Sequence, residues 1–295
     1  MEKEKLTNTL QLERQLVFYK IMKYPVPSEA EYFLFDEKAK VDAVHIQRLG
    51  NFEKSKDFSR PVENPYMEEY RTFINKYAWL YKSLPFIKSI YLCNSITFNA
   101  LKEDSDIDIF IVTKKGALRR ARFFSEFYFR LFFLKRGLRS HKRKKFCLSF
   151  YVTEESQNLY PIMLPQNDIY FIYWMAHLVP LYQEEFYNIY KDNRRLTSVL
   201  PYFPGKSTIN IGIPTTYGRS WWKKTTEFRL GGPRGKLIEL CLKMLRLPIV
   251  IYKKNKLKSK GRGIIINKHM LKFHEDSRKR VHLLYEVYVK SYKTK

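Results

Sequence analysis

The sequence predicts a fold of the α/β or α+β class, in which helices flank a small mixed β-sheet. Segments with strand-like and helix-like patterns alternate between residues 86 and 153. Helical periodicity dominates on both sides of that stretch. With 295 residues and a hydrophobic content of 45%, the chain can bury a sizeable core.

The N-terminal region, residues 1–84, is expected to be helical, and a winged-helix arrangement is one alternative for it. Apolar residues recur at helical spacing in "LERQLVFYKIM", and "YPVPSEAEYFLF" supplies a proline stop followed by a Ser N-cap. The segment "NPYMEEYRTFINKYAWLYKSLP" predicts one long amphipathic helix that ends at Pro85.

The central region, residues 85–204, carries the alternating pattern. Strands are predicted for "FIKSIYLC", "DIDIFIVT" and "KFCLSFYVT", with a short helical stretch after Asn94-Ser95 and a basic aromatic helix over 117–139. Residues 168–200 are expected to be helical again. Alternation along the third strand predicts one face with Phe146, Leu148, Phe150 and Val152, and an opposite face with Cys147, Ser149 and Tyr151.

The C-terminal region, residues 205–295, is expected to be basic and helical. It follows a linker that begins near "PYFPGKSTINIGIPTTYG". Helices are predicted for "LIELCLKMLRLPIVIY" and "SRKRVHLLYEVYVKSY".

The net charge of +26 points to a polyanionic partner. The excess lies in two blocks, +12 over residues 114–145 and +18 over 205–295. RNA, DNA, nucleotides or an anionic membrane surface are the candidates, and the alternative is a solvated basic surface in a lysine-rich protein. The basic helix is expected to turn Arg119, Arg120, Arg122 and Arg130 outward.

A cytoplasmic protein without a transmembrane segment is expected. The three cysteines, Cys93, Cys147 and Cys241, are widely spaced among apolar residues, which suits reduced, buried thiols. The charged N-terminus does not resemble a signal peptide, and the most apolar stretches are too short or too interrupted to cross a bilayer.

Asp106 and Asp108 are the candidate metal ligands, and they stand at the start of an apolar strand. Residues two apart on a strand point to one face, and a divalent cation relieves the repulsion between two neighbouring carboxylates. Asn94-Ser95 lies between a strand and a helix start, where backbone N–H groups can hold phosphate. The alternative for the acidic pair is a solvated turn.

These residues together resemble the DNA polymerase β-like nucleotidyltransferase superfamily over roughly residues 86 to 155. The usual pattern there is Gly-Ser after a strand and then, after a short gap, Ser-Asp-hydrophobic-Asp. Here Asn94 stands at the glycine and Ser95 at the serine, and Ser105, Asp106, Ile107 and Asp108 form the acidic motif. A looser resemblance extends to uncharacterised bacterial proteins with a nucleotidyltransferase domain.

The resemblance implies transfer of a nucleoside monophosphate from a nucleoside triphosphate to an unknown acceptor. Asp106 and Asp108 would be the catalytic metal ligands for Mg²⁺, and Asn94, Ser95 and Ser105 would bind the nucleotide. Two departures stand out. Asn94 replaces glycine, and the strand 145–153 lacks the third carboxylate that the superfamily carries there, for which Glu154 and Glu155 are the nearest substitutes.

Several other residues have both a functional and a structural interpretation. Lys102, Lys114 and Lys115 could contact phosphates or be solvated. Trp221 and Trp222, amid lysines, could stack on bases, or one Trp could lie in the core beside a basic surface. The two leading hypotheses are a Mg²⁺-dependent nucleotidyltransferase and a catalytically inactive protein of the same fold that binds nucleic acid. A partner-binding scaffold is the third.

Overall fold

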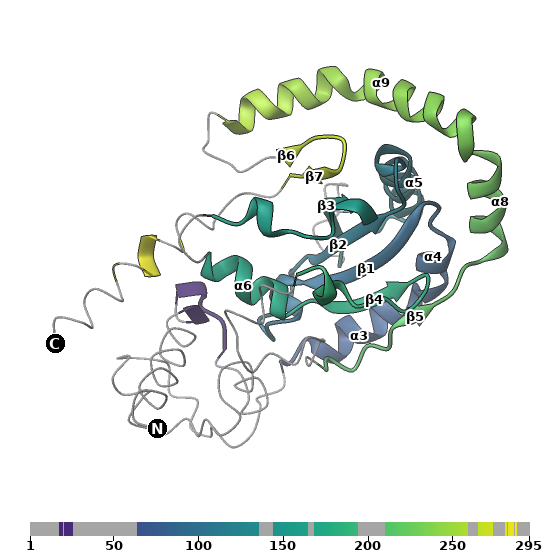
Figure 1. The fold of residues 1–295 in the computed structure, drawn as a ribbon. Coiled ribbons are helices and arrows are strands. Elements are labelled where there is room, and N and C mark those ends of the chain that lie inside the picture. The colour runs from purple at the N-terminus through teal and green to yellow at the C-terminus, as the bar shows by residue number, and fades with distance from the viewer. Residues whose placement is uncertain are drawn as a thin grey trace, which may run out of the picture.

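A seven-stranded mixed sheet with helices on both faces forms the protein, which confirms the predicted class (Figure 1). The computed structural model describes residues 18–19, 21–25, 64–135, 144–164, 168–193, 210–258, 265–273, 281, 283–285 and 287. The strand order is β5-β4-β1-β2-β3-β7-β6.

The three central strands are β1 (Ile87–Cys93), β2 (Ile107–Thr113) and β3 (Phe146–Thr153). β2 pairs antiparallel with β1 and parallel with β3. The sheet is extended by four short strands: β4 (Val179–Gln183), β5 (Thr216–Tyr217), β6 (Ile265–Ile266) and β7 (Met270–Lys272). The ends of β1 and β2 that bear Asn94 and Asp108 therefore lie in the middle of the sheet.

Helices cover both faces of this sheet (Figure 1). Their bounds are α3 (Met67–Lys76), α4 (Ala78–Ser83), α5 (Leu118–Leu131), α6 (Ile169–Ala176), α8 (Trp221–Arg229) and α9 (Gly232–Lys258). Single 3₁₀ turns are η2 (Asn94–Ile96), η3 (Glu154–Ser156), η4 (Tyr160–Ile162) and η5 (Ile189–Lys191). α3, α4 and α5 pack on one face, and α6 packs on the other.

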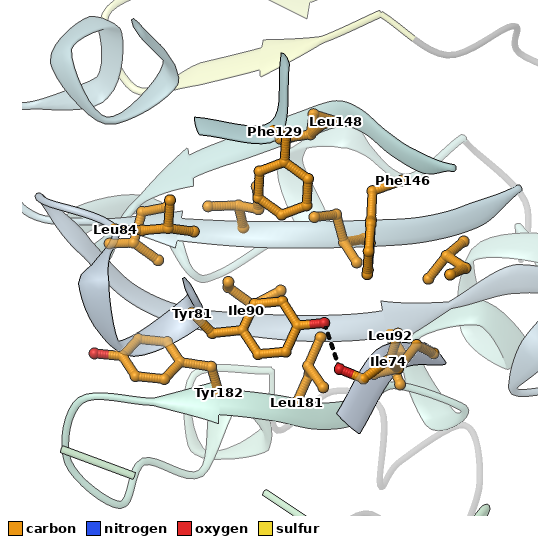
Figure 2. Packing of buried hydrophobic residues seen from close by; sticks show 14 of the residues in the cluster. Ile74, Tyr81, Leu84, Ile90, Leu92, Phe129, Phe146, Leu148, Leu181 and Tyr182 are labelled. Carbon is orange, nitrogen blue, oxygen red and sulfur yellow. Dashed lines mark hydrogen bonds between the residues drawn. The ribbon is translucent and has the colours of Figure 1, made fainter. Parts of the chain in front are cut away.

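The face under α3, α4 and α5 is a continuous apolar layer. Figure 2 shows Tyr81 of α4 packed against Ile90 of β1 and Leu181 of β4. The ring of Phe129 of α5 lies beside that of Phe146 of β3, with 5.0 Å between the ring centroids. Each fully buried aliphatic or aromatic side chain contributes roughly 1.5–3 kcal/mol. The Tyr81 hydroxyl, which is fully buried, donates to the carbonyl of Ile74 at 2.9 Å, so its polar end is satisfied.

The opposite face is an aromatic layer beneath α6. The Trp174 ring packs edge-on against that of Phe110 of β2, with 5.5 Å between the ring centroids. It also stacks on the Phe150 ring of β3, with 5.6 Å between the ring centroids. The short described segment near the N-terminus joins this layer, because the ring centroid of Phe18 lies 4.6 Å from that of Tyr173 of α6. This face also carries Asp108, since side chains two apart on β2 share a face.

The predicted face assignment of β3 is wrong beyond Leu148. The register between β2 and β3 shifts there: Asp108 pairs with Cys147, but Phe110 pairs with Phe150. One extra residue in β3 reverses the alternation, as a β-bulge does. Phe150 consequently joins the aromatic layer, and Tyr151 joins Phe146 on the α5 side, where its hydroxyl lies 2.9 Å from Ser125 Oγ.

Several predicted helices also differ from the observed elements. The single helix expected before Pro85 is two helices that meet at Tyr77. Within 168–193, α6 ends at Ala176 and β4 follows, although helix was expected. The region 205–295, expected to be helical, contributes α8 and α9 but also β5, β6 and β7. The predictions for most of 1–63 and for 194–209 fall outside the described residues.

Candidate functional site

The site begins where β1 ends and β2 starts. Cys93, the last residue of β1, pairs with Asp108, so the residue that follows it, Asn94, lies beside the aspartate. Asn94 Nδ2 donates to Asp108 Oδ2 at 3.0 Å, and the Tyr170 hydroxyl donates to Asn94 Oδ1 at 3.3 Å. The structure therefore brings together two of the residues that the sequence pattern singled out.

Asn94 has a left-handed backbone with φ of 61°. Asparagine tolerates this region better than most residues other than glycine. This conformation ends β1 and opens the turn η2, in which the Asn94 carbonyl accepts from the Thr97 backbone N–H and hydroxyl, both at 3.0 Å. Asn94 thus combines a left-handed backbone, which glycine also adopts readily, with a side-chain contact to Asp108.

Ser95 lies on this turn and is partly exposed, and its carbonyl accepts from the Ala100 N–H at 2.8 Å. The short helix expected here is only the three-residue 3₁₀ turn η2. Such a turn lacks the aligned peptides that give a longer helix its dipole. Phosphate binding at this turn stays a prediction, and it would rest on the Ser95 hydroxyl more than on a helix dipole.

Ser105 and Asp106 lie in the turn before β2, which Tyr70 of α3 holds. The Tyr70 hydroxyl donates to the Ser105 carbonyl at 2.6 Å, and Ser105 Oγ accepts from the Lys102 N–H at 2.8 Å. Burial, together with the charges of nearby acids including Asp106, raises the pKa of Tyr70 to about 12. Asp106 and Asp108 are both partly exposed, so a ligand can reach this edge of the sheet.

An aromatic stack that the sequence patterns did not reveal lies beside Asp108. The Tyr24 ring stacks on that of Phe98 with 4.8 Å between the ring centroids, and the Phe98 ring stacks on that of His177 with 4.1 Å between them. Burial raises the pKa of Tyr24, and the charge of Asp108 acts in the same direction. The three residues are far apart in the sequence, so no local spacing indicates that they meet.

Cys147 occupies the position on β3 that is in register with Asp108, and its Sγ lies 3.3 Å from Ser149 Oγ. Glu154 and Glu155 do not substitute for a third carboxylate. β2 and β3 are parallel, so these glutamates lie at the other end of the sheet, roughly 23 Å along the strand from Cys147. Among the described residues, no group of three or more His, Cys, Asp or Glu side chains could hold a metal ion.

The two glutamates have ion-pair partners of their own at that distant end. Lys115 Nζ lies 2.7 Å from Glu155 Oε1, and the Lys115 backbone N–H donates to Glu154. Lys114 contacts the buried Glu184 at 3.1 Å and Glu227 at 2.6 Å. Lys114 and Lys115 therefore form ion pairs at the far end of β2, away from Asp108. Of the three lysines considered as phosphate ligands, only the exposed Lys102 lies near the site.

The tryptophan pair on α8 is exposed, and neither residue lies in the core: Trp221 is 75% and Trp222 is 48% exposed. The neighbouring Lys223 is fully buried, with its ammonium 2.8 Å from the Tyr182 hydroxyl. Burial lowers the pKa of Lys223 to about 8, although Glu184 and Glu227 oppose the shift. Lys223 is thus unavailable to phosphates.

The prediction that the α5 arginines face outward is wrong for Arg120, which is 5% exposed, and for Arg119 and Arg122, whose side chains are only 18% and 12% exposed. The Arg120 Nε lies 3.3 Å from Glu239 of α9, because α9 lies over this side of α5. Arg122 pairs with Glu126 at 2.8 Å and lies over the Phe273 ring, while Arg130 is exposed as predicted. Of the three cysteines predicted to be buried, Cys93 and Cys147 are buried, but Cys241 is exposed, so the prediction is wrong for Cys241.

Comparison with protein-family models, with curated proteins and with solved structures gave no match for this chain. In the part of the chain that the structure describes, no helix combines the length and apolar character needed to cross a bilayer.

Proposed function

We propose that the protein is a Mg²⁺-dependent nucleotidyltransferase whose active site is the edge formed by the end of β1 and the start of β2. The single observation that supports this proposal is the contact of Asn94 with Asp108. It joins one residue from each half of the motif at one place in the sheet, although Asn94 and Asp108 are fourteen positions apart in the sequence. The chemistry of the donors agrees with the same role.

The residues present fit magnesium that arrives with a nucleotide. Mg²⁺ takes oxygen ligands, keeps several waters, and is usually bound by one or two carboxylates together with substrate phosphates. Asp106 and Asp108 are partly exposed residues at one strand end, although the Asp108 Oδ1 atom itself is buried. When bound, the cation would neutralise charge on the triphosphate as pyrophosphate leaves.

The protein groups would act mainly by positioning. Asn94 would hold Asp108 Oδ2 through its Nδ2, and Tyr170 would fix the Asn94 amide through Oδ1. The Ser95 hydroxyl would donate to a phosphate oxygen. The acceptor oxygen forms a bond to the α-phosphorus, the bond from that phosphorus to the bridging oxygen breaks, pyrophosphate leaves with the electron pair, and the acceptor proton passes to solvent.

Pyrophosphate release from each of the four common nucleoside triphosphates, with Mg²⁺ and then with EDTA, tests the proposal. Wild-type protein should release pyrophosphate only with Mg²⁺, and Asp106→Asn or Asp108→Asn should abolish the release. Asp104→Asn is the matched control, because Asp104 is an exposed acid two residues before Asp106. If the wild type releases no pyrophosphate with any nucleotide, or if the Asp108 variant is as active as the control, the proposal fails.

A second candidate is a catalytically inactive protein of this fold that binds RNA or DNA. The observation in its favour is Cys147, which stands in register with Asp108 where a further carboxylate would complete the site. The basic blocks would supply the phosphate contacts. Binding to RNA or DNA that weakens steeply with salt and does not change in Asp108→Asn, without pyrophosphate release, would favour this candidate. Absence of binding at low salt would exclude it.

A further inference from the structure

α9 presents an exposed apolar stripe on its outer side, which we call the outer stripe. Its members follow helical spacing: Leu237, Leu240, Cys241, Met244, Leu245 and Pro248. The four largest are 53% to 72% exposed. The surfaces of soluble proteins commonly carry isolated apolar side chains. A run of apolar residues at positions i, i+3, i+4, i+7, i+8 and i+11 instead forms one continuous helix face, which indicates a binding surface.

The opposite side of α9 attaches the helix to the fold. Gly235 is buried, and Ile238, Glu239 and Leu242 are partly buried. Glu239 accepts from the backbone N–H of Arg119 at the start of α5 at 2.7 Å. Figure 1 shows α9 as a long helix along the outside of the molecule, beyond α5. The outer stripe therefore remains exposed while α9 is held in place.

The charge of α9 identifies the kind of partner. The helix contains eight lysines and arginines and a single acidic residue, Glu239, which already pairs with Arg119 and Arg120. Lys236 and Lys243, seven residues apart and both exposed, flank the outer stripe along one side. A helix of this kind combines an apolar face with a basic margin.

We propose that α9 docks in the plane of an anionic lipid bilayer, with the outer stripe in the acyl-chain boundary and the flanking lysines at the headgroups. Interfacial helices have this combination of apolar face and basic margin. Nucleic acid satisfies the lysines but not a row of leucine and methionine side chains, which cannot stack on bases as aromatic rings do. A second copy of the same strongly basic helix would meet it with like charge.

The dimensions of α9 suit this role. Twenty-seven residues give a helix about 40 Å long. Its cationic end, with Lys253, Lys254, Lys256 and Lys258, follows the apolar part directly. Each lysine near an anionic surface strengthens binding about fivefold at physiological salt. The proposal does not depend on the acidic site, so either can fail alone.

Co-sedimentation of the full-length protein with vesicles tests the proposal. Vesicles of phosphatidylcholine with about one third phosphatidylserine should bind the protein, and pure phosphatidylcholine vesicles should bind it at least ~10-fold more weakly. Leu240→Gln with Met244→Gln leaves the charge unchanged and should weaken binding at least ~10-fold, because two apolar contacts are lost. Lys236→Gln with Lys243→Gln should weaken it about 25-fold.

Phe186→Gln is the matched control, since Phe186 is 78% exposed after β4, away from α9. It should bind vesicles as the wild type does, and unchanged circular dichroism should show that every variant is folded. Two results would overturn the proposal: no binding to anionic vesicles, or equal binding by the wild type and the Leu240 and Met244 variant. If vesicles bind nothing and this variant dissociates a dimer, the outer stripe is an interface between two copies of the chain instead.

Discussion

Glu184 is a buried carboxylate, 3% exposed, that three cations share. Lys114 Nζ and Arg219 Nε each lie 3.1 Å from its Oε1, and Lys223 Nζ lies 3.5 Å from its Oε2. Glu227 is the only other acid that pairs with any of these cations among the described residues. The network ties α8 to β1 and β4, because Lys223 also donates to the Ile87 carbonyl.

Glu184→Gln is expected to lower the free energy of unfolding by ~3–5 kcal/mol. The substitution leaves three cations around one carboxylate, and removal of one partner from a buried ion pair strands the other charge. The largest part of this loss comes from the unpaired charge of Lys223, because its side chain is fully buried while that of Arg219 reaches solvent. The melting temperature should fall by roughly 6–15 °C.

Urea unfolding followed by circular dichroism measures this loss, with Glu185→Gln as the matched control. Glu185 is the next residue and is exposed, so its substitution should change stability by less than ~0.5 kcal/mol. Adding Lys223→Met to Glu184→Gln should recover part of the loss, since it removes the stranded charge. A loss below ~1 kcal/mol for Glu184→Gln, or no recovery in the double variant, would refute the charge-balance reasoning.

The contribution of Glu184 to the free energy of unfolding should depend on pH in a defined direction. Burial raises the pKa of Glu184, but Lys223 and Lys114 lower it more, so the folded-state pKa lies below the usual value of 4.5. The stabilisation from this carboxylate is therefore complete above about pH 4.5 and is lost as the pH falls through the folded-state pKa. The difference in stability between the wild type and Glu184→Gln should shrink in acid.

Two further predictions concern the neighbourhood of the candidate site. Because Asn94 has φ of 61°, Asn94→Ala should be ~1–2 kcal/mol less stable than Asn94→Gly in urea unfolding, although both lose the bond to Asp108; equal stability would contradict a left-handed backbone there. Burial lowers the pKa of His177 to about 4, so wild-type stability should fall by up to ~1.4 kcal/mol per pH unit below pH 6.5, and His177→Phe should lack this slope. An identical slope in both proteins would show that His177 is not buried in its neutral form.

Local patterns predicted the centre of the fold. β1, β2 and β3 lie where apolar periodicity placed them, because strands buried in a sheet carry strong signals. α5 begins as predicted but ends at Leu131, before the predicted end at 139. The nearness of Asn94 and Asp108 followed from motif spacing. β4 was predicted as helix: it is a five-residue strand that contains Pro180, and proline and shortness both weaken a strand signal.

Long-range arrangement could not be predicted in the same way. Whether β3 runs parallel or antiparallel to β2 decides where Glu154 and Glu155 lie, and no residue in either strand encodes that choice locally. The bulge in β3 and the pairing of Arg120 with Glu239 likewise depend on elements distant in the sequence. The aromatic stack of Tyr24, Phe98 and His177 is another product of the complete fold.

Calorimetric titration with a non-hydrolysable nucleoside triphosphate analogue, with and without Mg²⁺, tests most directly whether Asp106 and Asp108 bind a metal–nucleotide complex. The wild type should bind the analogue only with Mg²⁺, and the double variant Asp106→Asn with Asp108→Asn should lose that binding while it unfolds like the wild type in urea. Binding that is equally strong without Mg²⁺, or unchanged in the folded double variant, would contradict the assignment of this edge of the sheet as the active site.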